Sequence, residues 1–410
     1  MKKLIQELTV NVIGLGYIGL PTSLILAAKG VNVIGTDINS SLISQLRDGR
    51  LSFTENGLEE LFIRADANGI SFQCDYIKAD VYIVAVPTPY LKREKKVDAT
   101  YVRKAVQEVL SVCDDGAIIV IESTISPGTI DKQIRPIANE SNKNIHLVHA
   151  PERIIPGNMI NELKANNRTI GADNIEIGNT IKNLYQTFCE GVITVTDIKT
   201  AEMTKVVENT YRDINIAFAN ELMKICREDN LDVYKIIEIA NLHPRVNILS
   251  PGPGVGGHCI SVDPWFLVGD YPGLANIILA ARKINDSMPD FVLERAVEIM
   301  EKEKITDISK VGIYGLTYKE NVDDIRESPT LQLIDSMRRH MAFGIKVYDP
   351  LAPRGIVENQ YYDFDEFLKD IDMVIVMVGH NHLIENESKL KNKIILDTRN
   401  IVRNKEVYRL

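Results

Sequence analysis

The chain has 410 residues, of which 45% are hydrophobic and 25% charged, a balance typical of a globular protein with two or three domains. Its formal net charge is −9 and it has no dense block of Lys and Arg, which disfavours a nucleic-acid or membrane-surface partner. The five cysteines are scattered without a Cys-x-x-Cys pair, so the sequence predicts neither a zinc site nor a disulfide framework and favours the cytoplasm. The apolar runs fall short of the ~20 residues that span a bilayer, so we expect no membrane span.

Strand and helix signals alternate through the first part of the chain. Short β-branched runs occupy residues 9–13, 32–35, 81–86, 117–121 and 145–148, with longer amphipathic stretches between them. This alternation predicts a parallel, doubly wound sheet of Rossmann type.

The remaining elements divide the rest of the chain in two. Apolar residues at three-to-four spacing predict one long helix over residues 200–228. Strand signals return at residues 311–314, 345–348, 373–377 and 394–396 and indicate a smaller Rossmann-like α/β unit. We therefore expect an α/β protein with a dinucleotide-binding domain (1–199), a central helical region (200–304) and a C-terminal α/β domain (305–410).

A glycine-rich loop, Gly14-Leu-Gly-Tyr-Ile-Gly19, follows the first predicted strand and precedes a helical pattern. Gly14 permits a tight turn, Gly16 lets the backbone approach a pyrophosphate, and Gly19 lets the helix pack on the strand. Asp37 closes the next strand, where a carboxylate accepts ribose hydroxyls and repels a 2′-phosphate. The loop predicts NAD⁺ rather than NADP⁺ as cofactor. The alternative is an ordinary strand–turn–helix corner.

Two further loops leave predicted strand ends, at residues 86–89 and 122–124. The carboxyl ends of strands line the ligand crevice of a doubly wound sheet. Thr88 and Thr124 are therefore candidate hydroxyl contacts to the cofactor, unless they serve loop structure alone.

A second glycine-rich segment, residues 251–258, ends directly before Cys259. Closely spaced glycines let backbone N–H groups converge on one point, as in an oxyanion hole beside a thiol. Asp263 follows four residues on and is placed to orient a water. A thiolate in a dehydrogenase lets an aldehyde lose a second hydride through a thioester. The alternative is that Cys259 is a small buried hydrophobe.

Lys205, Asn209 and Arg212 share one face of the predicted long helix at i, i+4, i+7 spacing. Two interpretations remain open for this stripe: a solvated helix face, or a lysine base beside two polar substrate contacts.

Several stretches resemble the UDP-glucose/GDP-mannose dehydrogenase family and follow its order through nearly the whole chain: residues 12–21, 84–89, 122–124, 150–153, 200–222, 243–266 and 315–329. The resemblance implies the four-electron oxidation of a nucleotide-sugar C6 alcohol to a carboxylate with two NAD⁺. It also implies that the C-terminal domain binds UDP and that the long helix is the core of a homodimer or larger homo-oligomer.

The resemblance also implies a role for individual residues. Cys259 would be the nucleophile and Lys205 the general acid/base, Asn209 and Asp263 would hold the catalytic water, and Glu152 and Thr124 would line the reacting centre. The expected NAD contacts are Gly14, Gly16, Tyr17, Ile18, Gly19, Asp37, Thr88, Thr124 and Arg326. The expected substrate contacts are Arg153, Ile154, Lys205, Asn209, Arg212, His243, Arg245, Gly256, His258, Tyr318, Lys319 and Arg399, with Arg245 reaching the site of a neighbouring subunit.

The residues around Cys259 indicate a branch of the family. The UDP-glucose branch typically continues its cysteine with Phe-Pro-Lys-Asp, whereas here Cys259 is followed by Ile-Ser-Val-Asp and the lysine is missing. His258 and Arg153 resemble the N-acetylhexosaminuronate branch. UDP-N-acetylglucosamine enzymes frequently carry a proline at the position of Ser261 and lack the pair Arg212-Asp213. Both differences favour UDP-N-acetyl-D-mannosamine as substrate. UDP-N-acetylglucosamine is the alternative.

Two other functions compete with this interpretation. A single-step dehydrogenase of the β-hydroxyacid type shares the fold but needs no thiol, so the Cys259 loop argues against it. An NAD⁺-binding regulatory module needs no catalytic groups, so the combination of Lys205, Asn209 and Cys259 argues against it.

Overall fold

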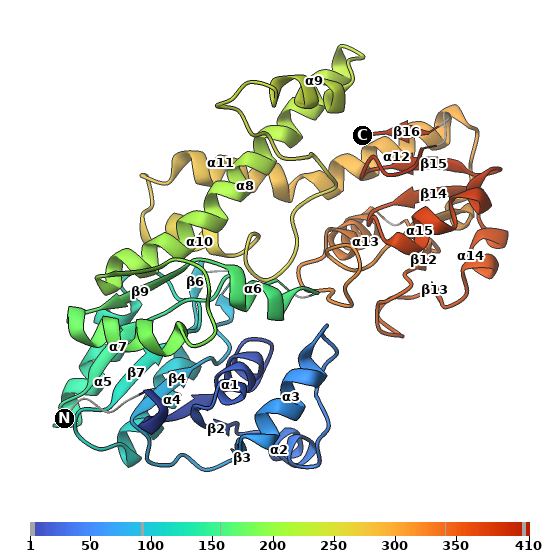
Figure 1. Cartoon of the computed structure of the whole chain (residues 1–410). Coiled ribbons are helices and arrows are strands. Elements are labelled where there is room, and N and C mark those ends of the chain that lie inside the picture. Colours follow the sequence, from blue (N-terminus) through green and yellow to red (C-terminus); the bar gives the residue numbers. More distant parts are fainter. Residues whose placement is uncertain (1–4, 92–93, 156, 341, 404–406) are drawn as a thin grey trace. The chain divides into compact units, whose positions relative to one another are not determined.

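The computed structural model describes residues 5–91, 94–155, 157–340, 342–403 and 407–410. The chain forms two compact units, residues 1–207 and 208–410. Helix α8 (Ile198–Glu228) begins in the first unit and continues into the second, as the green helix of Figure 1 shows. Among the described residues, no helix combines the length and the apolar character needed to cross a membrane.

The first unit is built on an eight-stranded sheet in the order β10-β9-β8-β7-β4-β1-β2-β3. The part from β8 to β3 is parallel and has the strand order of a dinucleotide-binding fold, whereas β9 runs antiparallel to β8 and β10 parallel to β9. The strands are β1 (Thr9–Ile13), β2 (Asn32–Thr36), β3 (Ser71–Gln73), β4 (Val81–Val84), β7 (Ile118–Ile121), β8 (His146–His149), β9 (Arg168–Ala172) and β10 (Ile193–Thr196). A short hairpin joins β5 (Tyr90–Leu91) to β6 (Lys96–Val97).

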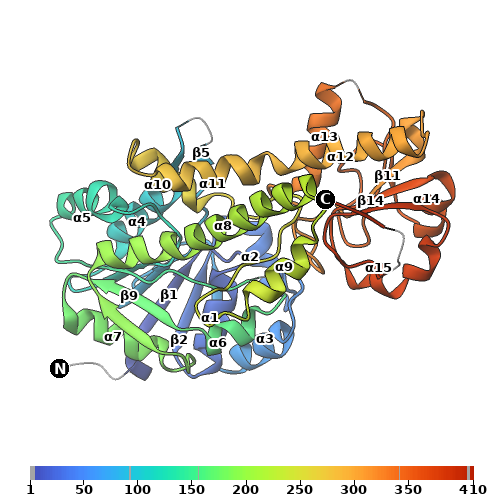
Figure 2. The same cartoon turned by 90° about the horizontal axis from the view of Figure 1, so that it is seen from above.

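Helices cover both faces of this sheet because successive strand residues point to opposite sides. Val10 and Val12 of β1 pack with Leu24, Leu61 and many others into one buried cluster. Ile13, Val84 and Ile119 belong to a second cluster with the opposite helices. The first face carries α1 (Gly19–Ala28), α3 (Leu58–Ala67), α6 (Met159–Ala165) and α7 (Ile175–Tyr185), and the second carries α4 (Thr100–Val112) and α5 (Arg135–Glu140) (Figure 2). Helix α2 (Ser40–Arg47) connects β2 to α3.

The second unit combines helices with a parallel six-stranded sheet in the order β13-β12-β11-β14-β15-β16. The strands are β11 (Val311–Tyr314), β12 (Lys346–Tyr348), β13 (Gln360–Tyr361), β14 (Met373–Val376), β15 (Ile394–Asp397) and β16 (Tyr408–Arg409). The helices after α8 are α9 (Val233–Ala240), α10 (Asp263–Asp270), α11 (Asn276–Asp286), α12 (Met288–Lys302), α13 (Pro329–Arg339), α14 (Phe364–Asp370) and α15 (Asn381–Glu385).

The predicted α/β fold class, with two Rossmann-like sheets and a long central helix, is confirmed. Strands β3, β9, β10, β13 and β16 were not predicted, because these short strands carry weak apolar runs. The two sheets also share a detail. The Asp37 carboxylate after β2 accepts the N–H of Leu15 at 2.8 Å, and the Asp349 carboxylate after β12 accepts the N–H of Leu316 at 2.6 Å.

Candidate active site

The Gly14–Gly19 loop connects β1 to α1 at the carboxyl edge of the first sheet, and its glycines have three different environments. Gly14 has a φ of +88°, which L side chains rarely adopt, and a Cβ there would lie 2.6 Å from the Ala85 carbonyl oxygen. A Cβ at Gly19 would lie 1.8 Å from the Gly14 oxygen. Nothing lies within 4 Å of the corresponding position at Gly16. The open side of Gly16 fits the close approach of a dinucleotide phosphate.

The Asp37 carboxylate has free acceptor capacity beside this loop. One oxygen accepts the Leu15 N–H at 2.8 Å and the other accepts the Asn39 N–H at 2.9 Å. A carboxylate offers about four acceptor positions, so two remain for ribose hydroxyls. The Asp349 carboxylate of the second unit differs. It accepts the N–H groups of Leu316, Thr317, Leu351 and Ala352 together with His380, which leaves no position for a ribose.

Both predicted threonine loops leave the same edge of the first sheet. Thr88 is buried just after β4, and Thr124 is half-buried just after β7. The Ser123 hydroxyl ties the two loops together by donating to the Val86 carbonyl at 2.7 Å. Tyr17 lies on the cofactor loop with its ring centroid 4.5 Å from that of Phe53. Ile18 precedes α1 and is half-buried.

Glu152 follows β8 and belongs to a buried charged cluster that the sequence analysis missed. Arg168, the first residue of β9, pairs with Glu152 and lies 3.5 Å from Glu122, with all three side chains at most 4% exposed. Tyr185 donates its hydroxyl to Glu122 at 3.0 Å. Burial raises the pKa of Glu122 to about 7, Arg168 opposes the rise and Glu152 adds to it.

Two predicted substrate contacts next to Glu152 are engaged with protein atoms. The Arg153 guanidinium donates to the Asn167 carbonyl at 2.6 Å and to the Thr169 hydroxyl at 2.9 Å. Ile154 packs against the main apolar cluster of the first unit. These contacts hold the chain after Glu152 against the start of β9.

Lys205 is only 6% exposed on α8, so the solvated-face interpretation is wrong for this residue. It lies near His149, the last residue of β8. The His149 ring is fully buried, and its Nδ1 lies 2.8 Å from the Ile121 carbonyl oxygen. A carbonyl only accepts, so Nδ1 carries the proton. Burial, together with the charge of Lys205, lowers the pKa of His149 to about 4, and the ring is neutral at pH 7.

In the second unit, the side chains of Asn209 and Asp263 are hydrogen-bonded to each other. The sequence alone could not show this contact between residues 54 positions apart. The Asn209 side-chain amide on α8 donates to the Asp263 carboxylate at 2.6 Å, and both residues are buried. Asp263 is the first residue of α10, and its N–H donates to the Cys259 carbonyl at 2.8 Å. Cys259 itself is exposed, which excludes the small-buried-hydrophobe interpretation.

Close neighbours explain why glycine stands at two positions before Cys259, a reason that was not predicted from the sequence. A Cβ at Gly256 would lie 2.7 Å from the Glu327 oxygen, and one at Gly257 would lie 2.8 Å from the Tyr318 ring. The Gly257 N–H donates to the Arg326 carbonyl at 3.0 Å, and the Gly252 N–H to Asn220 at 2.8 Å. These two N–H groups are therefore used inside the protein and do not point to an oxyanion.

Three other predicted ligand contacts, Tyr318, Arg326 and Arg399, lie against this loop. Tyr318 is close to Cys259, and burial raises its pKa to about 12. Arg326 is held by Asp324 through bonds of 3.0 and 2.6 Å. A Cβ at Gly252 would lie 2.7 Å from an Arg399 guanidinium nitrogen. Lys319 is half-buried, and its carbonyl accepts the Thr317 hydroxyl.

The remaining predicted contacts of the second unit are exposed: Arg212 on α8, His243 and Arg245 after α9, and His258 before the cysteine. The Arg245 N–H donates to His243 Nδ1 at 3.3 Å, so these two lie together on one loop.

A buried polar network that the sequence analysis missed fastens this loop to α8. The Asp213 carboxylate accepts a hydrogen bond from the Arg282 guanidinium at 2.6 Å and one from the Asn285 amide at 2.7 Å. The Asp213 side chain is 0% exposed and that of Arg282 is 2% exposed. Asn285 in turn bonds Asn220, which accepts the Gly252 N–H. The sequence alone indicates Asp213 only as a residue typical of the branch, not as part of a buried network.

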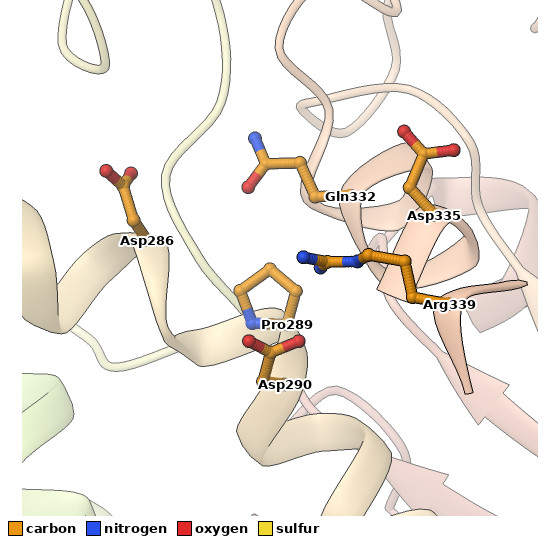
Figure 3. A pocket seen from close by; sticks show the side chains of 6 residues that line it. All are labelled: Asp286, Pro289, Asp290, Gln332, Asp335 and Arg339. Carbon is orange, nitrogen blue, oxygen red and sulfur yellow. The ribbon is translucent and has the colours of Figure 1, made fainter. Parts of the chain in front are cut away.

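A cavity of about 410 Å³ lies elsewhere in the second unit and contains none of the predicted site residues. It is lined by Asp286, Pro289, Asp290, Gln332, Asp335 and Arg339 of α11, α12 and α13 (Figure 3). Among the described residues, no group of three or more His, Cys, Asp or Glu side chains is arranged to hold a metal ion.

A Rossmann-type sheet with a dinucleotide loop, joined to a second unit with an exposed cysteine on a glycine-rich loop, defines a nucleotide-dependent dehydrogenase. The family models agree. Residues 8–189 match the NAD binding domain, residues 199–287 the central domain and residues 312–404 the UDP binding domain of the UDP-glucose/GDP-mannose dehydrogenase family. The chain therefore belongs to this family, and the predicted cofactor, NAD, is confirmed.

Individual relatives cover nearly the whole chain. A UDP-N-acetyl-D-mannosamine dehydrogenase of Methanocaldococcus jannaschii is 45% identical over 97% of this chain and 93% of that protein. An NDP-N-acetyl-D-galactosaminuronic acid dehydrogenase of Ralstonia nicotianae is 37% identical over 95% of each. Among solved structures, a UDP-D-ManNAc dehydrogenase of Pyrococcus horikoshii matches with a TM-score of 0.89 at 35% identity and 97% coverage of both chains.

Proposed function

We propose that this protein oxidises the C6 hydroxyl of UDP-N-acetyl-D-mannosamine to the carboxylate, using two NAD⁺ per sugar. The exposed Cys259, next to the bonded pair Asn209 and Asp263, is the observation that carries the proposal. A single-step alcohol dehydrogenase needs no such thiol, whereas a four-electron oxidation needs a nucleophile that converts the aldehyde into a thioester. The name of the Methanocaldococcus relative supports the choice of sugar.

The chemistry requires a base, a nucleophile and a water. Lys205 takes the proton of the C6 hydroxyl as the C6 carbon gives up a hydride. The Cys259 thiolate then adds to the aldehyde carbon, and the aldehyde oxygen takes a proton from Lys205 to give a thiohemiacetal. The thiohemiacetal returns that proton to Lys205, gives up a second hydride and becomes a thioester. Asn209 and Asp263 hold the water that cleaves the thioester, and this water supplies the second carboxylate oxygen. Thr124 and Glu152 line the reacting centre.

Bound NAD⁺ supplies the hydride acceptor for both oxidations. The Gly14–Gly19 loop would hold it, with open space at Gly16 for its phosphates, and the two unused acceptor positions of Asp37 would accept ribose hydroxyls. Tyr17, Ile18, Thr88, Thr124 and Arg326 complete the proposed NAD contacts.

Recognition of UDP and the sugar is assigned to the loops of the second unit and to the chain after Glu152. The proposed contacts are Arg153, Ile154, Lys205, Asn209, Arg212, His243, Arg245, Gly256, His258, Tyr318, Lys319 and Arg399. A pocket that hydrogen-bonds the acetamide rejects UDP-glucose strongly, because its buried donors would be left unpaired. Rejection of a C2 epimer is weaker, since an epimer still supplies an acetamide.

A panel of UDP-sugars with NADH absorbance as the readout tests this function. We expect kcat/KM to fall in the order UDP-N-acetyl-D-mannosamine, UDP-N-acetylglucosamine, UDP-glucose, with two NADH per sugar consumed. A lead for UDP-N-acetylglucosamine would overturn the choice of C2 epimer. The panel also includes a nucleotide-linked N-acetyl-D-galactosamine, because the name of the Ralstonia relative contains N-acetyl-D-galactosaminuronic acid. One NADH per sugar would overturn the thioester route, and no NADH with any sugar would return the chain to the class of regulatory modules.

We further propose a cytoplasmic homodimer or larger homo-oligomer with the three domains 1–199, 200–304 and 305–410. The exposed apolar side chains of α8 support the assembly, since Tyr211, Phe218 and Ile225 are 63%, 54% and 55% exposed. Arg245, exposed after α9, would then reach the site of the neighbouring subunit.

A further inference from the structure

The buried cluster around Glu122 contains two carboxylates and one arginine. Glu122 and Glu152, called here the carboxylate pair, both contact Arg168, and none of the three side chains is more than 4% exposed. If both carboxylates were ionised, the group would carry one uncompensated negative charge out of reach of water. An uncompensated buried charge is costly, so the pair favours retaining one proton.

The hydrogen bonds show which member keeps the proton. Glu152 pairs with Arg168 and accepts the Arg153 N–H at 2.6 Å, so both of its oxygens have charged or strong donors. Glu122 has a longer contact of 3.5 Å with Arg168 and a neutral donor, the Tyr185 hydroxyl at 3.0 Å. Its second oxygen is buried and has no partner among the described residues. The carboxylate of Glu152 is therefore the ionised member, and Glu122 is the protonated one.

We propose that Glu122 is a positioning residue that acts through Arg168: while it holds the shared proton, Arg168 is committed to Glu152, and Glu152 stays ionised and fixed at the reacting centre. This rests on the proposed function, in which Glu152 lines that centre. When Glu122 loses its proton, its new charge competes with Glu152 for Arg168, so Glu152 is held less firmly.

The surroundings of Glu122 set where this transition occurs. Arg168 on β9, Glu152 after β8 and Tyr185 on α7 are the charged and titratable groups that face it, Thr22 of α1 lies beside it, and Cys189 lies near Arg168. Burial raises the pKa of Glu122 to about 7, above its ordinary range. The proton is therefore held below about pH 7 and lost above it.

The test compares kcat across pH for the wild type and Glu122→Gln, because glutamine keeps the shape of a protonated carboxyl and cannot ionise. We expect the two enzymes to agree within about threefold at pH 6. The ratio of kcat for Glu122→Gln to kcat for the wild type should then rise across pH 7. A ratio that is constant with pH overturns the proposal.

Two further variants make the result specific. Tyr185→Phe removes the hydroxyl that favours the ionised form of Glu122. When Glu122→Gln is compared with unchanged Glu122 in the Tyr185→Phe background, the ratio of kcat should therefore rise at a higher pH. Glu202→Gln is the matched control: Glu202 is also a buried carboxyl with a pKa raised to about 7 by burial, but it bonds the N–H groups of Gly128 and Ile130. The ratio of kcat for Glu202→Gln to kcat for the wild type should not change across pH 7. A change equal to that of Glu122→Gln overturns the role assigned to Glu122.

A measurement without turnover covers the case in which a variant folds poorly. With glutamate ¹³C-labelled at Cδ, the wild type should show a carboxyl signal that titrates near pH 7 and that is missing in Glu122→Gln. Absence of that signal difference overturns the proposal. If the wild type oxidises no UDP-sugar, the proposed function fails, while the carboxyl titration still decides the state of Glu122.

Discussion

Cys259 combines exposure with a fixed backbone. Its carbonyl accepts the Asp263 N–H at the start of α10, and Gly257 before it has a φ of +87° and no room for a Cβ beside Tyr318. Cys259 is therefore an exposed residue on a segment that backbone hydrogen bonds and close contacts hold in place. This is the arrangement expected of a nucleophile rather than of a packing residue.

We predict that Cys259→Ser abolishes steady turnover, because a serine hydroxyl adds poorly to an aldehyde and its ester hydrolyses more slowly than a thioester. The first oxidation should survive as a burst of at most about one NADH per enzyme, measured by stopped-flow absorbance. Cys74→Ser, at a half-buried cysteine of the first unit, is the control and should keep full turnover. Normal turnover of Cys259→Ser would show that the cysteine is structural.

Lys205, buried on α8, is the proposed general base. We predict that Lys205→Ala lowers kcat by roughly 10²–10⁴ with a much smaller change of KM, since proton transfer contributes about that factor. Lys199→Ala is the control, because that side chain is on the same helix, 71% exposed, and only pairs with Asp131. A loss confined to thermal stability, with normal kcat, would contradict the role as base.

At the scale of elements, polar side chains fix the loops that leave the two sheets. In the second sheet, Asp349 gathers the loop after β11, the loop after β12 and His380 around one carboxylate. Burial acts to raise its pKa, but the His380 bond and the N–H groups of Leu351 and Leu316 lower the pKa to about 2. Because the folded-state pKa is depressed, its stabilisation is complete above pH 4 and is lost as pH falls through 2.

We predict that Asp349→Asn lowers the free energy of unfolding at pH 7 by about 2 kcal/mol, the equivalent of that pKa depression. Urea unfolding at pH 7 and at pH 2.5 measures it, and the difference from wild type should shrink at the lower pH. Asp365→Asn, at a side chain 69% exposed on α14, is the control and should change stability by less than ~0.5 kcal/mol. An equal loss at both pH values would contradict the role of the ionised carboxylate.

At the scale of the whole molecule, α8 is both a core helix and a surface. Its buried side carries Asp213 and Asn220, which fasten α11 and the Gly252 loop, while Phe218 on the same helix is 54% exposed. An exposed apolar stripe on a helix of this length is typical of a subunit interface.

We predict that Phe218→Glu weakens the assembly, because a charge buried in an apolar interface is left unpaired. Light scattering after size exclusion should give at least twice the chain mass for the wild type and a shift toward the single chain for the variant. Phe343→Glu, at a 60% exposed side chain before β12, is the control. A monomeric wild type would refute the proposed homo-oligomer.

Local sequence was enough to predict the elements and loops whose conformation depends on residues close together in the chain. The Gly14–Gly19 loop, the strand at residues 9–13 and the long helix all follow from spacing and residue type. Their conformations depend on neighbouring residues and on steric limits at glycine, which the sequence displays directly.

Tertiary structure alone decided which distant side chains meet. Arg168 contacts Glu122 from 46 positions away, and Arg282 contacts Asp213 from 69 positions away. Neither arginine lies in a motif, and each is buried only because two strands or two helices place it opposite a carboxylate. Strand β9 runs antiparallel to β8, so its first residue, Arg168, lies at the sheet edge where β7 and β8 end, close to Glu122 and Glu152. Burial and shared partners then set the protonation of these side chains.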